Sequence, residues 1–341
     1  MPRAVGSPVA DALTSEALTP DEALTVRFGQ DLRAVWPEID AEHAPRLGVA
    51  VSGGPDSMAL LLLVAATLPG RVEAATVDHR LRADNAREAA DVARLCAALQ
   101  VPHETLAVTV EAGNVQDAAR QARYAALGDW ARERGLGAVA TAHHADDQAE
   151  TLLMRLNRAS GVAGLAGVRP RGRLADAPAL LLRPVLAWRR AELAGIVAAA
   201  GVTAAEDPSN ADDRFDRARL RKAMREVDWL DVAAIAQSAA HLAEADAAVA
   251  WTADLEYGAR VKRDPFGLTY RPMAPRAVAL RVIARIVTEL DAEPRGSAVA
   301  RLFDTLTMGE PASIGNLVAR PNAGGWSFAK APARKAAPKR G

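Results

Sequence analysis

The strongest chemical signal in the chain is a short run of small and acidic residues, Ser52, Gly53, Gly54, Pro55, Asp56 and Ser57. An apolar stretch at 47–51 predicts a buried strand before this run, and an apolar stretch from Met58 predicts a helix after it. Two glycines let a ligand approach the backbone closely, and the first N–H groups of a helix have no partners within the helix. Because the helix dipole also favours negative charge there, the loop predicts a phosphate or pyrophosphate site. The alternative is a Gly-Gly turn in which Ser52 or Asp56 caps the helix.

A second group of chemically useful side chains lies in the segment 140–158, ATAHHADDQAETLLMRLNR. Asp147 and Glu150 are three residues apart and Asp146 and Glu150 are four apart, so each pair shares a helix face. Acids at a helix start are usually caps, but here three acids accompany His143 and His144. Such a cluster suits magnesium on a polyphosphate, or an amine held by carboxylates.

Arginines form the third group. Arg120 and Arg123 precede Tyr124 on a helical pattern, and either planar guanidinium could bind a carboxylate or a phosphate. The segment 206–225, EDPSNADDRFDRARLRKAMR, joins a turn signature to a dense run of basic residues. Within it, one helical stripe carries Arg214, Arg217 and Arg221. A solvated helix face is the alternative in both places, but the arginine density favours contacts with ATP or with a nucleic-acid backbone.

These groups need a fold that brings them together, and the pattern of apolar residues predicts one. Predicted strands cover 47–51, 71–77, 104–109, 137–142 and, as a short segment, 180–184. Predicted helices cover 21–36, 56–68, 84–99, 115–134, 146–159 and 189–200. Alternating strands and helices predict an α/β fold with a doubly wound parallel sheet, in which ligands bind at the carboxyl ends of the strands. The loop 52–57, Asp78-His79 and His143-His144 all follow strands, so we expect them to share one crevice.

Composition sets further limits. The 341 residues have a formal net charge of zero, so nucleic-acid binding would need a local basic patch. Cys96 is the single cysteine, which excludes a disulfide framework, a thiolate zinc site and a two-cysteine redox pair within the chain. The sequence has no apolar run long enough for a membrane span and no secretory signal pattern, so we expect a soluble cytoplasmic protein without membrane partners.

We expect four segments along the chain. A loose lead-in at 1–20 precedes a catalytic domain at 21–226, which contains a mobile loop rich in Gly, Ala, Arg and Pro at 161–180. The Ala-rich pattern that follows predicts a smaller C-terminal helical domain at 227–329. A basic tail at 330–341 is expected to be disordered.

The order Ser-Gly-Gly-x-Asp-Ser resembles the PP-loop of the ATP pyrophosphatase superfamily, which splits ATP into AMP and pyrophosphate. Together with AARQARYAAL, HHADDQAETLLMRLNRASGVAGLAG, LLRPVL and DPSNADDRFDRARLR, in this order over roughly 46–226, it resembles the signature set of the tRNA(Ile)-lysidine synthetase family. The resemblance implies that ATP activates the C2 oxygen of the wobble cytidine in an isoleucine tRNA with a CAU anticodon. The ε-amine of L-lysine then displaces AMP to give lysidine. It further implies Mg²⁺ as cofactor and a helical domain that contacts tRNA, and it allows a homodimer.

The same resemblance assigns roles to single residues. The loop Ser52 to Ser57 binds the pyrophosphate part of ATP, with Asp56 also near magnesium. Val77, Asp78 and His79 lie near the adenosine. Around lysine and the reacting groups, the family places residues that match Arg123, Asp147, Glu150 and Arg217. The same block is completed by His144, as a nucleotide-binding residue, and by Asp146, as a second metal ligand. The chain departs from the family pattern at Arg217-Ala218, where many members have Arg-Asn, so Arg219 or Arg221 is an alternative to Arg217.

Three other functions compete with this interpretation. A PP-loop tRNA 2-thiolation enzyme needs a cysteine pair or a thiolate-bound cluster, which Cys96 alone cannot supply. An amidotransferase-type synthetase needs an ammonia-supplying domain or partner. A non-catalytic nucleotide sensor has no use for the acids at 146–150.

Overall fold

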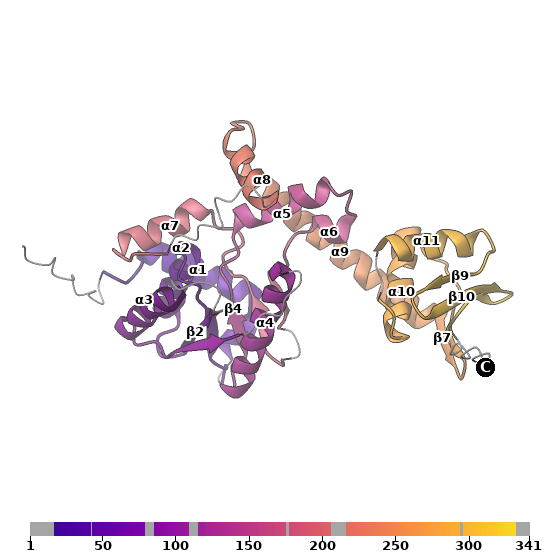
Figure 1. Cartoon of the computed structure of the whole chain (residues 1–341), viewed down its shortest axis with the longest axis horizontal. Coiled ribbons are helices and arrows are strands. Elements are labelled where there is room, and N and C mark those ends of the chain that lie inside the picture. Colours follow the sequence, from indigo (N-terminus) through magenta and orange to yellow (C-terminus); the bar gives the residue numbers. More distant parts are fainter. Residues whose placement is uncertain are drawn as a thin grey trace, which may run out of the picture. The chain divides into compact units, whose positions relative to one another are not determined.

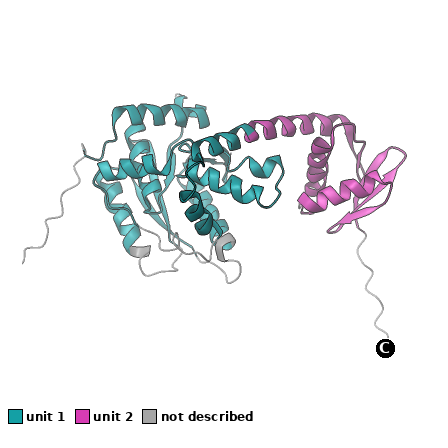
Figure 2. Ribbon diagram, turned by 90° about the horizontal axis from the view of Figure 1, so that it is seen from above, with its two compact units in different colours: residues 1–241 teal, residues 242–341 magenta. Residues whose placement is uncertain are grey.

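The computed structural model describes residues 17–41, 43–78, 85–108, 115–174, 177–205, 216–293 and 296–331. The chain divides into two compact units, residues 1–241 and 242–341, which Figure 2 distinguishes by colour. Most of the expected lead-in and of the basic tail, together with His79 and the turn at 207–210, lies outside the described residues. No helix among the described residues is long and apolar enough to cross a membrane.

A six-stranded sheet forms the centre of the first unit, with the strand order β3-β2-β1-β4-β6-β5. Its strands are β1 (Leu47–Ala50), β2 (Val72–Asp78), β3 (His103–Ala107), β4 (Ala138–Ala140), β5 (Arg171–Arg173) and β6 (Leu180–Leu182). All neighbouring pairs are parallel except β5 with β6, which is antiparallel. The parallel sheet expected from the alternating pattern is therefore confirmed, and its carboxyl edge follows from the common strand direction.

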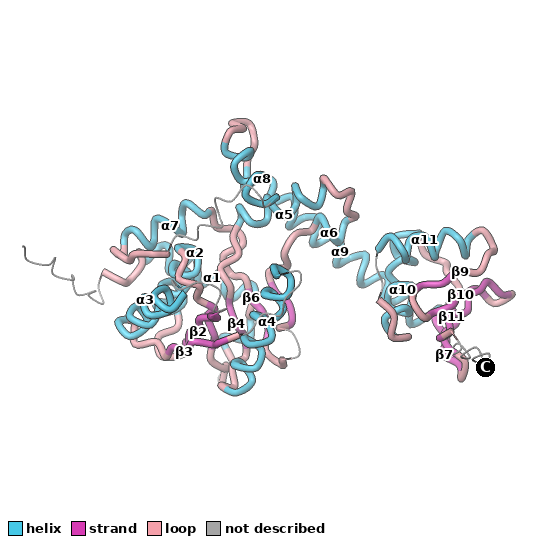
Figure 3. Tube along the Cα trace, in the orientation of Figure 1, coloured by secondary structure: helices cyan, strands magenta, loops and turns pink. Residues whose placement is uncertain are grey.

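Helices cover both faces of this sheet. The described helices that precede α9 (Val232–Arg260) are α1 (Glu22–Val35), α2 (Pro55–Thr67), α3 (Asn85–Ala98), α4 (Val115–Glu133), α5 (Ala145–Leu156), α6 (Val162–Leu165), α7 (Arg190–Ala199) and α8 (Asp216–Arg225), with a short 3₁₀ turn at Pro37–Asp40. One apolar core joins the sheet to α1, α2, α3 and α7, and a second core joins its other face to α4 (Figure 3). Successive residues of β4 alternate between the cores, Ala138 and Ala140 in the first and Val139 in the second. Burial on both faces explains why these strands have continuous apolar runs.

The segment 161–180, which the Gly and Pro content predicts to be a mobile loop, instead contains α6 and β5. Antiparallel pairing of Arg171–Arg173 with β6 extends the sheet beyond its parallel strands. The Gln148 side chain, on α5, also holds this segment by hydrogen bonds with the backbone N–H and C=O of Val168. The expectation of a loop is corrected because these long-range contacts override the local composition.

The second unit contains a sheet as well as helices. It comprises α10 (Arg276–Glu289), α11 (Gly296–Thr307), β7 (Val261–Asp264), β8 (Gly267–Tyr270), β9 (Ala312–Ile314), β10 (Leu317–Asn322) and β11 (Gly325–Lys330), and it includes most of α9 (Val232–Arg260), within which the two units meet. The five strands form an antiparallel sheet in the order β7-β8-β11-β10-β9. The sequence predicts only the helices. The alternation of buried Trp326 and Phe328 after an Asn-Ala-Gly-Gly turn is a hairpin signal that identifies β10 and β11.

Candidate active site

The loop after β1 is ordered by its own serines and leaves a helix end uncapped. The Ser52 backbone N–H donates to Ser57 Oγ at 3.1 Å, and the Ser57 hydroxyl donates to the Gly54 carbonyl at 2.9 Å. Gly53 has a φ of +86°, which side-chain-bearing residues rarely adopt, and its carbonyl accepts from Ala205 N–H at 2.9 Å. Among the described residues, no side chain caps α2, so its first amides are available to an anion.

His144 connects this loop to α5, the acidic helix that carries Asp146, Asp147 and Glu150. It follows β4, it is buried, and it precedes α5 as the N-cap residue. Its Nε2 lies 3.4 Å from Asp56 Oδ2 and 3.6 Å from Asp147 Oδ2. Its Nδ1 lies 3.7 Å from Asp146 Oδ2. Burial alone would lower the pKa of His144, but the hydrogen bond to Asp56 and the charges of the three acids raise it. The buried imidazole of His144 thus lies between the loop after β1 and the start of α5.

Asp56 and Asp146 are the two acids expected to bind a metal ion, and their surroundings in the structure suit Asp56 to that role. Asp56 Oδ1 is buried and has no hydrogen-bond partner among the described residues, as expected of a carboxylate that awaits a cation. Asp146 instead accepts from Arg189 Nε at 3.2 Å and Nη2 at 3.3 Å, and from Arg190 N–H at 2.9 Å. These bonds oppose the effect of burial and lower the pKa of Asp146. The geometry therefore supports Asp56 as a metal ligand and makes Asp146 a link to the start of α7.

Across the described residues, no cluster of three or more His, Cys, Asp or Glu side chains could bind a metal ion through protein ligands alone. Magnesium commonly binds one or two carboxylates and takes its remaining ligands from substrate phosphates and water. A single carboxylate beside a phosphate loop fits that pattern.

Glu150 is enclosed between α5 and α8, which lie against each other (Figure 1). Only 2% of Glu150 is exposed, and both of its carboxylate oxygens are occupied. Arg217 Nε donates to Oε2 at 2.9 Å, and Arg221 donates through Nε to Oε1 at 2.7 Å and through Nη2 to Oε2 at 3.1 Å. Arg217 Nη2 also lies 4.0 Å from Asp147 Oδ1. The two arginines therefore converge on the acidic pair that the sequence singles out.

The structure separates the three arginines that the sequence leaves open. Arg219 pairs with Asp216 at 2.6 Å, three residues before it on the exposed side of α8. Arg217 and Arg221 both face α5 through Glu150. Helical spacing explains this, because positions four apart share a face and the position between them does not.

Arg123 lies on α4, on the other side of the sheet from α1, α2 and α3. Its guanidinium carbon lies 5.3 Å from the centre of the Tyr124 ring, and that of Arg120 lies 5.0 Å from the same ring. His143 Nδ1 lies 3.0 Å from Thr141 Oγ1. Burial, and then the charges of Arg183, Arg123, Arg120 and Arg217, lower the pKa of His143 to about 3. A neutral imidazole therefore lies among these arginines, and the described residues show no ion pair between Arg123 and the acids of α5.

Val77 is half-buried near the end of β2, the strand next to β1. The Val51 N–H donates to the Ala75 carbonyl at 2.8 Å, which fixes the phosphate loop beside this strand end. His79 and Arg214 lie outside the described residues, so the structure does not place them.

Three residues complete the site without having been assigned a role from the sequence: Arg183, Arg189 and His143. Arg183 directly follows β6, just as the phosphate loop follows β1 and His144 follows β4. Its position after a parallel strand was a usable signal, but the strand is only three residues long and weak in sequence.

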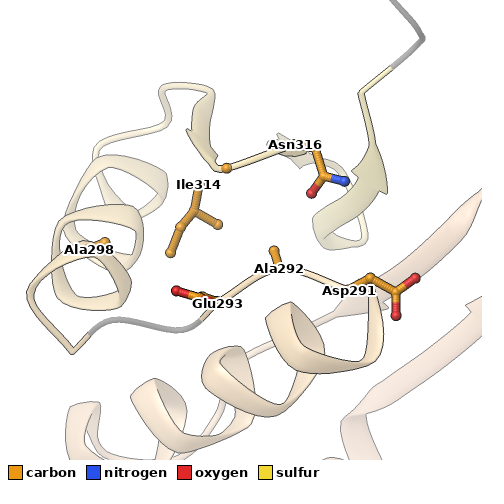
Figure 4. A pocket seen from close by; sticks show the side chains of 7 residues that line it. Asp291, Ala292, Glu293, Ala298, Ile314 and Asn316 are labelled. Carbon is orange, nitrogen blue, oxygen red and sulfur yellow. The ribbon is translucent and has the colours of Figure 1, made fainter. Parts of the chain in front are cut away.

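The pocket in Figure 4 lies in the second unit and contains none of these residues. Its volume is about 470 Å³, and its walls are formed by Asp291, Ala292, Glu293, Ala298, Ile314, Gly315 and Asn316. Asp291 is paired with Lys330, and the remaining walls are mostly small or apolar. Nothing in this lining has the phosphate-binding character of the loop after β1.

Comparison with known proteins agrees with this geometry. Residues 24–227 match the family model of the PP-loop domain. The tRNA(Ile)-lysidine synthase of Novosphingobium aromaticivorans is 46% identical over 88% of this chain and 93% of its own length. That of Zymomonas mobilis is 40% identical, over 86% and 90%.

Solved structures show the same fold. The U34-tRNA thiolase from Methanococcus maripaludis, solved with its 4Fe-4S cluster, matches with a TM-score of 0.53 at 13% identity. The match covers 66% of this chain and 81% of the thiolase. The phosphate loop, the acidic helix and the extended sequence identity lead to one conclusion: the chain belongs to the tRNA(Ile)-lysidine synthase family of PP-loop proteins.

Proposed function

We propose that the protein uses ATP to adenylate the C2 oxygen of the wobble cytidine in a CAU-anticodon isoleucine tRNA, releasing pyrophosphate. The ε-amine of L-lysine then attacks C2, the bond from C2 to the adenylated oxygen breaks, and AMP leaves to give lysidine. One observation carries this proposal. Asp56 of the phosphate loop lies 3.4 Å from His144, which lies 3.6 Å from Asp147, so nucleotide and amine sites are adjacent. A tRNA substrate implies that the protein acts in the cytoplasm.

In this proposal, the backbone amides of 52–57 hold the phosphates of ATP, and Val77 and His79 lie toward the nucleoside. Asp56 is the proposed Mg²⁺ ligand because its Oδ1 has no protein partner among the described residues. A bound magnesium ion would neutralise phosphate charge and polarise the bond that breaks. His144 is buried between Asp56 and Asp147 and contacts both carboxylates through Nε2.

The amine site is proposed at Asp147 and Glu150, with Arg123 and Arg217 binding anionic groups beside it. Asp147 is the more accessible acid, with 19% of its side chain exposed. The lysine ammonium would approach Glu150 by displacing Arg217, whose side chain is 45% exposed, more readily than Arg221, at 20%. Glu150 would then exchange one cation for another, so its buried carboxylate would not be left without a counterion when lysine binds.

The proposal is tested by incubating the protein with ATP, Mg²⁺, labelled lysine and transcripts of isoleucine tRNA bearing CAU. We expect label in the wobble nucleoside after nuclease digestion, together with AMP and pyrophosphate. A methionine tRNA transcript with the same anticodon is the control and should remain unlabelled. Well-folded protein that labels neither transcript would reject the function.

The competing function, tRNA 2-thiolation, needs a reactive cysteine, so the state of Cys96 tests it. This residue is fully buried in α3, and burial raises the pKa of its thiol to about 12, so it is protonated at neutral pH. We expect no reaction with a thiol reagent at pH 8 until the protein is unfolded. We further expect Cys96→Ser to retain lysidine formation, with a loss of stability of about 1 kcal/mol. Rapid labelling of the native protein, or an inactive but folded Cys96→Ser variant, would favour thiol chemistry.

The segment 227–329 is the proposed tRNA-contacting part of the chain. Trp229 and Trp251 expose their indoles, with Trp251 66% exposed on α9, and exposed aromatic rings can stack on unpaired bases. We expect Trp251→Ala to raise the KM for tRNA about fivefold or more and to leave the KM for ATP unchanged. Met308→Ala is the matched control, since Met308 is also exposed in this unit but has no ring. Equal KM values for tRNA in the two variants would contradict a contact at Trp251.

A further inference from the structure

The first turn of α5, which carries acids of the site, is tied to the residues at the start of α7. The Ala145 N–H donates to the Trp188 carbonyl at 2.9 Å, and the Arg190 N–H donates to Asp146 Oδ2, also at 2.9 Å. The Arg189 guanidinium donates to both oxygens of Asp146, from Nε to Oδ2 at 3.2 Å and from Nη2 to Oδ1 at 3.3 Å. Because one planar guanidinium engages both oxygens of one carboxylate, this contact fixes direction as well as distance.

The residues at the start of α7 are themselves held by α1. Trp188 is fully buried, and its Nε1 donates to Asp31 Oδ2 at 2.8 Å. The guanidinium carbon of Arg27 lies 4.1 Å from the centre of the Trp188 ring, and Arg27 Nη1 donates to Glu192 Oε1 at 2.6 Å. The other oxygen of Glu192 accepts from the Arg189 N–H at 2.6 Å, which fixes the Arg189 backbone before α7. The Arg189 side chain therefore extends toward Asp146 from an anchored backbone.

The turn that Arg189 holds sets the places of His144 and Asp147. Asp146 Oδ2 lies 3.7 Å from His144 Nδ1, a buried atom without a hydrogen-bond partner among the described residues. On the other side of the ring, His144 Nε2 lies 3.4 Å from Asp56 Oδ2 and 3.6 Å from Asp147 Oδ2. A shift of this turn would change each of these distances, and a misplacement of about 1 Å can slow an enzymatic reaction about 100-fold.

We propose that Arg189 is a positioning residue of the reaction, which acts through Asp146 to hold the first turn of α5 beside the phosphate loop. Both oxygens of Asp146 already accept hydrogen bonds from Arg189 and Arg190, so Asp146 serves alignment rather than metal binding. Arg189 itself binds no substrate. It keeps Asp147 close to Asp56, so that the amine meets the adenylated cytidine. The inference rests on the proposed function, because it concerns the same site.

The test compares Arg189→Gln, Asp146→Asn and the double variant in lysine attachment to the isoleucine tRNA transcript. We expect each single variant to lower kcat about 10-fold and to change the KM values for ATP and lysine by less than about threefold. Because the two side chains act through each other, kcat of the double variant should lie within about twofold of that of the slower single variant. Arg189→Lys keeps the charge but cannot engage both oxygens in one plane, so its kcat should lie between those of Arg189→Gln and the wild type.

Arg33→Gln is the matched control. Arg33 also donates from Nε to an aspartate, Asp40, at 3.2 Å, but this pair is exposed and belongs to no part of the site. The control should keep full activity. Thermal unfolding of every variant shows whether it is folded at the assay temperature.

Magnesium distinguishes alignment from metal binding. Arg189→Gln and Asp146→Asn should both reach half-maximal rate at the same Mg²⁺ concentration as the wild type. ATP with Mg²⁺ should also raise their melting temperatures by the same amount as in the wild type. If Asp146→Asn alone needs more Mg²⁺ or loses that rise, Asp146 is a metal ligand and the inference is wrong.

Other results also overturn the inference. An unchanged kcat in folded Arg189→Gln and Arg189→Lys would show that the contact only supports stability. Losses that multiply in the double variant would show that Arg189 and Asp146 act independently. If Arg189→Gln does not fold, kcat of Arg189→Lys decides, and a wild-type value overturns the inference. A wild-type protein that attaches no lysine would reject the proposed function and this inference together, whereas an active protein whose Arg189 variants keep the wild-type kcat rejects only the inference.

Discussion

Replacing Asp56 with asparagine is expected to lower the rate of lysidine formation by at least about 100-fold while the protein remains folded. Asparagine has the same shape but no charge, so it binds a cation much more weakly at the position of Oδ1, the atom that has no hydrogen-bond partner among the described residues. Asp56 lies in the first turn of α2 and is not part of an apolar core, so the loss of stability should be small. The rate is measured by lysine incorporation, and folding by thermal unfolding.

Asp129→Asn is the matched control for this variant, because Asp129 is an exposed acid on α4 whose partner is Arg132. It should keep full activity. An Asp56→Asn protein that turns over normally would remove Asp56 from the phosphate and magnesium site. An unfolded variant would show instead that the contact between Asp56 and His144 is structural.

Glu150→Gln is expected to raise the KM for lysine about tenfold or more, and to raise the KM for ATP much less. The change removes a buried negative charge that two arginines share, so we also expect a loss of about 2 kcal/mol of folding stability. Lysine and ATP are varied separately in steady-state assays, and stability is measured by denaturant unfolding. An equal rise in both KM values would assign Glu150 to the nucleotide site.

Arg221→Gln separates two ways in which Glu150 could act. If Glu150 binds the lysine ammonium directly, removing Arg221 frees one carboxylate oxygen, so the KM for lysine should stay the same or fall. If Glu150 acts only by holding the arginines in place, Arg221→Gln and Glu150→Gln should raise the same KM. Direct binding therefore predicts that only Glu150→Gln raises the KM for lysine, whereas a positioning role predicts that both variants raise it.

Much of the first unit could be predicted from the sequence because its signals are local. The apolar runs at 47–51 and 137–142 become β1 and β4, and a parallel sheet requires that the loops after them meet at one edge. That reasoning brings Asp56 and His144 together without any knowledge of side-chain direction.

Other features depend on contacts that the sequence does not encode locally. Acids at the start of a helix look alike in sequence, but Asp146 pairs with Arg189, 43 residues later in the chain, whereas Glu150 pairs with α8. The antiparallel strand β5 forms only because β6 offers it an edge. Arg183 belongs to the LLRPVL segment quoted from the sequence, but only the structure shows that its side chain is buried.

A crystal structure of the full chain with a non-hydrolysable ATP analogue, Mg²⁺ and lysine tests the central claim most directly. We predict phosphates against the backbone of 52–57, the ion on Asp56, and the lysine amine within hydrogen-bonding distance of Asp147 or Glu150. Phosphates bound elsewhere, or an amine far from both carboxylates, would contradict the adjacency of the nucleotide and amine sites on which the proposed reaction depends.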